Sequence, residues 1–79
     1  MKKRINETEV EMVAVESRNI SYVGYSEEKK FLVFEFIRGP VYVYDDVPKS
    51  TYDTLLSSTA IDDYFNDSVK NSFKNRRIM

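Results

Sequence analysis

The chain has 79 residues, of which 42% are hydrophobic and 32% are charged, and this length and composition are typical of one small globular domain. It contains neither cysteine nor histidine, which excludes disulfides, thiolate nucleophiles, imidazole bases and the commonest zinc ligands. No stretch approaches the ~20 apolar residues that span a bilayer, so we expect a soluble, cytoplasmic protein without membrane contact.

The net charge of −1 hides an uneven distribution along the chain. Residues 7–67 hold all 13 acidic residues but only five basic ones, which gives this stretch a net charge of −8. Basic residues gather near the two ends, within residues 2–4 and 70–77. Two interpretations stay open: the charged ends are simply solvated, or both ends fold onto one face and form a basic patch for phosphates.

The first segment, residues 1–14, is expected to be flexible or to add an edge strand to the fold. Val10, Met12 and Ala14 occupy alternate positions, which is the period of two that a strand requires. No turn residues flank this pattern, so the strand is only one of the two possibilities. The remaining residues, 15–79, are expected to form a single domain.

Three strands are predicted next, at residues 20–25, 31–37 and 41–44, because β-branched and aromatic residues dominate these segments. The connections between them are short, and the second contains the Gly39-Pro40 pair, so the strands should form an antiparallel meander. Alternate residues of a strand share one face of the sheet, and we expect the face that carries Glu35 to be the more solvated one.

Two short helices are predicted after the strands. Pro48 suits the start of a helix over residues 49–58, and Ile61, Tyr64 and Phe65 are spaced as the apolar stripe of a second helix. The segregation of strands and helices predicts an α+β fold. We expect a three-stranded antiparallel meander, with a possible fourth N-terminal edge strand, followed by two short helices packed on one sheet face.

Six tyrosines and five phenylalanines are the strongest departure from average composition, and two explanations compete for them. Large aromatic side chains bury the most area each, so a small domain without disulfides can use them as its core. An exposed row of aromatic rings can instead stack unpaired bases. Tyr42 and Tyr44 distinguish the two, because their spacing places both rings on the same face of a strand.

The sequence carries little that is suited to catalysis or metal binding. The carboxylate pairs 45–46 and 62–63 lack a partner cluster with ligand spacing, and adjacent strand residues point apart. No nucleophile elbow or phosphate-binding glycine loop is present. We therefore expect no enzyme activity, no metal and no small-molecule cofactor.

A series of short motifs, in a fixed order between Val15 and Ile78, resembles a known family. Its most recognisable part runs from Gly39 through the Tyr42-Val43-Tyr44 step to Pro48, and it is followed at the expected distance by Tyr64-Phe65-Asn66. This stretch looks like the KTSC domain, which occurs after the catalytic part of some lysyl-tRNA synthetases and as a free-standing small bacterial or viral protein. The resemblance implies a single α+β domain for which RNA binding has been suggested.

These observations favour a non-enzymatic, KTSC-like macromolecule-binding module with RNA as the first candidate partner. In this hypothesis basic residues of the tail contact phosphates and exposed tyrosines stack bases. The alternative is a small protein-interaction or inhibitor module of viral or prophage origin, which uses its acidic surface against a larger basic protein. In either case the chain is expected to be a monomer or a weak homodimer. The candidate RNA-binding residues are Lys70, Lys74, Arg76, Arg77, Tyr42 and Tyr44.

Overall fold

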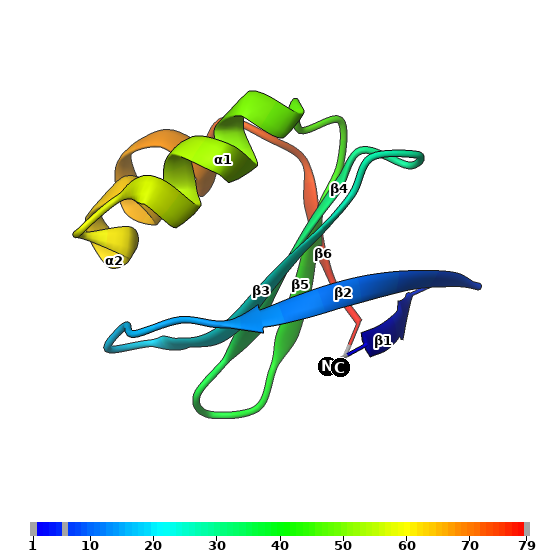
Figure 1. Cartoon of the computed structure of the whole chain (residues 1–79), viewed down its shortest axis with the longest axis horizontal. Helices are drawn as coiled ribbons and strands as arrows, with labels where there is room; N and C mark the ends of the chain where they lie inside the picture. The colour runs from blue at the N-terminus through cyan, green and yellow to red at the C-terminus, as the bar shows by residue number, and fades with distance from the viewer. Residues whose placement is uncertain (1, 6, 79) are drawn as a thin grey trace.

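A computed structural model describes residues 2–5 and 7–78 and shows one antiparallel sheet with two short helices packed against it (Figure 1). The six strands lie in the sheet in chain order, and each one pairs with the next. The strands are β1 (Lys2–Ile5), β2 (Thr8–Ala14), β3 (Ile20–Ser26), β4 (Phe31–Phe36), β5 (Val41–Tyr44) and β6 (Asn75–Arg77). The helices are α1 (Lys49–Ser57) and α2 (Ile61–Tyr64), and α2 continues into the π-helical turn η1 (Phe65–Val69).

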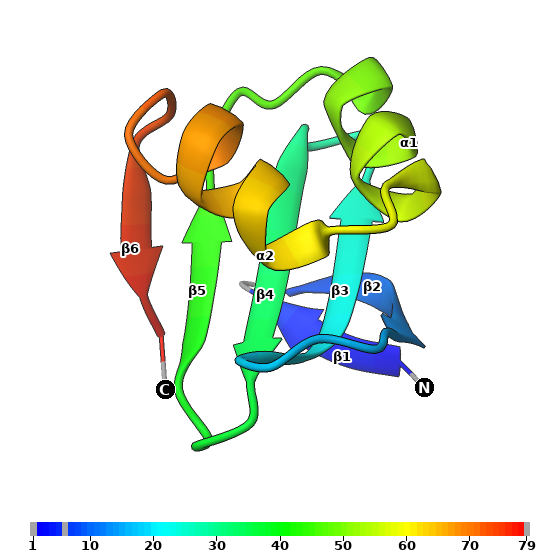
Figure 2. The same ribbon diagram turned by 90° about the vertical axis from the view of Figure 1, so that its left-hand side faces the viewer.

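The two helices cover one face of the central strands, as Figure 2 shows. Leu55 of α1 and Phe65 and Val69 of η1 are buried against this face. Phe34 lies at the centre, with its ring centroid 4.6 Å from that of Phe65 and 5.6 Å from that of Tyr44. Edge-to-face aromatic pairs of this kind add stability beyond the area that they bury. The aromatic residues of the central strands therefore belong mainly to the core.

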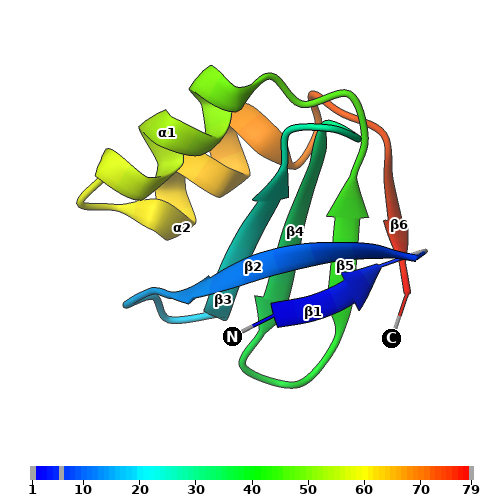
Figure 3. The ribbon, with the colours of Figure 1, turned by 45° about the vertical axis from the view of Figure 1, so that its right-hand side comes forward.

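The opposite face of the sheet is covered by the hairpin of β1 and β2, which crosses the central strands (Figure 3). Ile5, Val10 and Met12 of the hairpin form a second buried cluster with Val33 and with the inward valines of β5. The prediction that the face carrying Glu35 is the more solvated one is nevertheless confirmed along this segment, because Ile37 on that face is 57% exposed whereas Leu32 and Phe34 on the other face are fully buried. Glu35 itself is half-buried, and its carboxylate pairs with the Lys3 ammonium of β1 at 3.2 Å.

The close approach of β2 to β3 at Gly24 allows the hairpin to cross the sheet. Gly24 lies directly opposite Met12 in the register of the two strands. A Cβ atom at Gly24 would lie 2.5 Å from the Met12 sulfur, 2.7 Å from Val10 Cγ1 and 2.8 Å from the Glu11 carbonyl oxygen. These distances are shorter than van der Waals contact, so only a residue without a side chain permits this approach.

The sequence prediction of a three-stranded meander, with a possible fourth strand, is wrong in its strand number although the α+β class is confirmed. The N-terminal segment supplies two strands rather than one, so β2 lies inside the sheet and β1 forms the edge. The basic tail adds β6, which is held beside β5 by backbone hydrogen bonds from Asp45 to Lys74 and from Ile78 to Val41. The sheet is thus a curled half-barrel whose two faces are both covered.

Replacement of Gly24 by alanine should destabilise the fold by roughly 1–3 kcal/mol, because the added methyl group overpacks a site partly bounded by backbone. Urea unfolding measures this loss. Val13→Thr is the matched control, since it keeps a β-branched residue at an exposed position of the adjacent strand and should change stability by less than about 0.5 kcal/mol. Equal stability of Gly24→Ala and the native chain would contradict the close approach.

Candidate functional site

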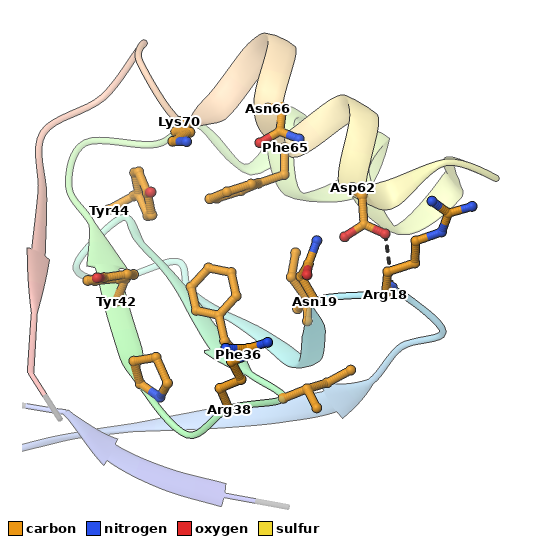
Figure 4. Close-up of a pocket in the computed structure, with 13 residues that line it drawn as sticks. Arg18, Asn19, Phe36, Arg38, Tyr42, Tyr44, Asp62, Phe65, Asn66 and Lys70 are labelled. Carbon is orange, nitrogen blue, oxygen red and sulfur yellow. Dashed lines mark hydrogen bonds between the residues drawn. The ribbon is translucent and has the colours of Figure 1, made fainter.

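A groove of about 530 Å³ lies between the helices and one end of the central strands (Figure 4). One wall comes from α2 and η1, through Asp62, Phe65, Asn66 and the following Lys70. The other wall comes from the β2–β3 connection and from the turn between β4 and β5. The lining residues on that side are Arg18, Asn19, Ile20, Ile37, Arg38 and Pro40.

The floor of the groove is aromatic. Phe36 and Tyr42 are each half-buried, and their ring centroids lie 5.5 Å apart in an edge-to-face arrangement. Phe65 and Tyr44 lie deeper, and the ring of Phe65 is 5.8 Å from those of both Phe36 and Tyr44. Rings held in this way are fixed by the core, while Phe36 and Tyr42 keep part of their surface open to a ligand. The floor can therefore offer a rigid apolar contact to a planar group.

The rim of the groove is cationic. Arg18, Arg38 and Lys70 are exposed and line it, against a single carboxylate from Asp62. Among the described residues, the ion pairs that form leave the charged ends of these three side chains unengaged. Arg77 lies opposite Tyr42 in the pairing of β5 with β6, so it extends from the same face of the sheet. A net positive rim around an aromatic floor suits an anionic, planar ligand.

Asp62 fixes the loop that carries Arg18. Its Oδ1 accepts a hydrogen bond of 2.6 Å from the Ser17 hydroxyl, and its Oδ2 accepts one of 3.0 Å from the Arg18 backbone N–H. The Ser17 hydroxyl oxygen in turn accepts the N–H groups of Asn19 and Ile20. The hydrogen bond from Ser17 is the main reason that the pKa of Asp62 is lowered, against the opposing effect of burial. Asp62 is thus a positioning group for one wall of the groove.

The four candidate basic residues of the tail lie in different surroundings. Lys70 lines the groove, and Lys74 is exposed outside it. The guanidinium of Arg76 donates to both carboxylate oxygens of Asp45, at 3.0 and 2.9 Å, and lies 5.1 Å from the centre of the Phe31 ring. Arg76 therefore already has a structural role, which joins β6 to the face opposite the groove.

The two candidate tyrosines both extend toward the helices. Tyr44 is only 3% exposed, and burial raises the pKa of its hydroxyl, with a smaller contribution from Tyr42. Its ring is enclosed by Phe34 and Phe65, so it serves as core. Tyr42 is half-buried at the groove floor. Of the pair, Tyr42 alone keeps a surface that a ligand can reach in this groove.

Sequence reasoning missed the groove residues outside the tail, above all Arg18, Asn19 and Arg38. A signal for them exists in the topology. Arg18 and Asn19 directly precede β3, and Arg38 follows the end of β4. Antiparallel neighbours place the start of one strand beside the end of the next, so these residues must meet at one end of the sheet. Both arginines lie within residues 7–67, whose net charge is −8. The distribution of charge along the sequence therefore gave no sign that they contribute to a basic site.

An acidic hollow lies at the other end of β3 and β4. It is formed by the β1–β2 turn and by the turn after Ser26, and five of its lining residues are glutamates against one lysine. The molecule thus separates its charge along the central strands, with the basic groove at one end and the acidic hollow at the other. The lining glutamates are Glu7, Glu9, Glu11, Glu27 and Glu28.

Two further features of the described residues concern metal binding and membrane crossing. Within residues 2–5 and 7–78, no group of three or more acidic side chains is arranged to hold a metal ion. In the same part of the chain, no helix combines the length and the apolar character that crossing a membrane requires. The groove gathers cationic, amide and aromatic groups in one place.

Comparison with known proteins assigns the family. Residues 16–73 match the sequence model of the KTSC domain. The chain belongs to the KTSC family. The matched residues include both walls of the groove, from Arg18 to Lys70, together with its aromatic floor. They leave out β1 and β2, which form the hairpin across the opposite face, and the last strand, β6.

Similar proteins support the same assignment. An uncharacterized protein of Stutzerimonas stutzeri (strain A1501) is 33% identical over 58 residues, which cover 73% of this chain and 82% of that protein. The crystal structure of a KTSC domain protein from Yersinia pestis has a TM-score of 0.83 at 25% identity, and the alignment covers 89% of this chain and 99% of that one. The half-barrel with its two helices is thus shared with an experimentally determined KTSC structure.

Asp62→Asn should lower stability by about 1 kcal/mol at pH 7, because it weakens two hydrogen bonds to a partly exposed carboxylate. The folded-state pKa of Asp62 is lowered, so its contribution is present above the unfolded pKa, near 4, and is lost as the pH falls through the folded value. Urea unfolding from pH 7 to pH 3 should therefore show the two proteins converging in acid. A difference that is independent of pH would contradict this role.

Proposed function

We propose that this KTSC domain is a non-enzymatic module that binds single-stranded RNA in the groove between its helices and the ends of β3 and β4. The observation that carries the proposal is the combination of a partly open aromatic floor, at Phe36 and Tyr42, with three exposed cations around it. Proteins that bind single strands use this combination, in which rings stack the bases and cations contact the phosphates.

The polar groups of the groove support RNA as the ligand. Asn19 and Asn66 bring side-chain amides to opposite walls, and an amide can both donate and accept a hydrogen bond. A base edge and a ribose 2′-hydroxyl present the complementary groups. The volume of the groove, about 530 Å³, also falls within the range of sites that enclose small organic ligands, roughly 300–1,000 Å³.

The overall acidity of the chain is compatible with this function because the charge is segregated. The acidic hollow repels a phosphate backbone at one end of the central strands, and the groove attracts it at the other. This separation would orient an approaching strand toward the groove. It also predicts a small contact area and an affinity that depends strongly on salt.

The acidic hollow favours a second candidate function, the binding of a basic protein surface. The hollow has one aromatic residue, Tyr25, whose ring stacks on Tyr52 and whose hydroxyl donates to the Val47 carbonyl. The Tyr25 ring is thus already packed within the fold, whereas the rings of Phe36 and Tyr42 in the groove are partly open. RNA binding is preferred because charge and aromatic surface meet in the groove.

The variant Arg38→Ala/Lys70→Ala should weaken the binding of a labelled uridine-rich 10-mer RNA roughly tenfold, since it removes two phosphate contacts from opposite walls. The slope of log K against log[salt] should fall in magnitude by about 1.4, at ~0.7 per phosphate for single strands. Fluorescence anisotropy between 25 and 200 mM salt measures both quantities.

The matched control is Lys29→Ala/Lys74→Ala, which removes the same charge from exposed positions outside the groove. It should keep most of the affinity of the native chain. Equal losses in the two double variants would indicate attraction by net charge alone, and no binding by the native protein at micromolar concentration would overturn the proposed function.

A further inference from the structure

The groove has cations at both of its ends and aromatic rings between them. Figure 4 shows Lys70 toward one end and Arg18 toward the other, where the Arg18 guanidinium lies on the side of Asp62 away from Phe36, with Arg38 near Phe36. Lys70 directly follows η1, whereas Arg18 belongs to the β2–β3 connection, so separate segments hold the two ends. This arrangement is more specific than a single phosphate pocket beside a stacking ring.

We infer that the groove takes an internal nucleotide of a continuous strand, which crosses from Lys70 to Arg18 with one phosphate held at each end. This inference rests on the proposed function and names the form of its ligand. The base of the central nucleotide lies on the floor formed by Phe36 and Tyr42. Its two flanking phosphodiesters reach the cations at the ends, and Arg38 contacts the backbone from the side wall.

The distribution of charge favours an internal nucleotide over a mononucleotide. A nucleoside monophosphate has its charge on one side of the base, so it can neutralise the cation at one end of the groove only. A continuous strand has a phosphate on each side and releases counterions at both ends. Because Lys70 and Arg18 are exposed side chains rather than enclosed groups, both ends leave a path for the strand to enter and to leave.

Asp62 fixes the backbone of the segment that presents Arg18. Both of its carboxylate oxygens accept hydrogen bonds from this Ser17–Arg18 segment. The acidic hollow beyond the far end of β3 and β4 limits how far a phosphate backbone can extend along the sheet. The structure therefore favours a short footprint, centred on one stacked base.

The fluorescent base 2-aminopurine, whose emission is quenched by stacking, tests this inference directly. The probes are 2-aminopurine riboside 5′-monophosphate, the trinucleotide uridine–2-aminopurine–uridine, and two trinucleotides in which one or the other phosphodiester is a neutral methylphosphonate. The trinucleotide should bind at least tenfold more tightly than the monophosphate. Each methylphosphonate should cost several-fold in affinity.

Double-mutant cycles with Lys70→Ala and Arg18→Ala assign the ends. Each variant should be insensitive to one of the two methylphosphonates and stay sensitive to the other, and the two variants should differ in which one. Lys74→Ala is the control and should respond like the native chain. Circular dichroism checks that each variant is folded.

The outcomes separate this inference from the function on which it rests. Equal affinity for the monophosphate and the trinucleotide, or coupling of both variants to the same phosphate, overturns the crossing strand and leaves RNA binding in place. Absence of quenching with every probe, together with absence of binding to a longer RNA, overturns both.

Discussion

The contact between β2 and the backbone of Gly24 is the constraint on which the rest of the structure depends. Met12, Val10 and the Glu11 carbonyl all approach the space that a side chain at this position would fill. This approach lets the N-terminal hairpin turn across the central strands and bury a second apolar cluster. With the helices on one face and the hairpin on the other, both faces of a short sheet are covered, and the groove lies at one of its ends.

The ends of the strands differ in charge, and this difference explains how an acidic chain can have a locally basic surface. The turn after β4 and the connection before β3 bring Arg38 and Arg18 together with Lys70. The opposite turns bring five glutamates together. A net charge of −1 is therefore a poor guide to the local field, which is set by which turns the antiparallel topology places side by side.

The sequence predicted the parts of the fold whose pattern is local. Strands β3, β4 and β5 and helix α1 follow from alternating or helical spacing of apolar residues, which depends on near neighbours only. By contrast β1 and β6 consist mainly of lysine, arginine and asparagine, and they become strands because adjacent strands supply hydrogen-bonding partners. The groove itself was not predicted: two of the candidate residues, Lys70 and Tyr42, line it, whereas Arg18 and Arg38 join them through the topology of the sheet.

The central claim is that this KTSC domain contacts RNA at the basic end of its sheet, and mapping by NMR tests it most directly. Titration of the ¹⁵N-labelled protein with a uridine-rich single-stranded RNA should shift the backbone amides of Arg18, Asn19, Arg38 and Asn66 in a saturable manner. The chemical shifts of the Glu9 and Glu27 amides, in the acidic hollow, should not change. Saturable shifts confined to the hollow, or to residues 74–77 of the tail, would contradict the account.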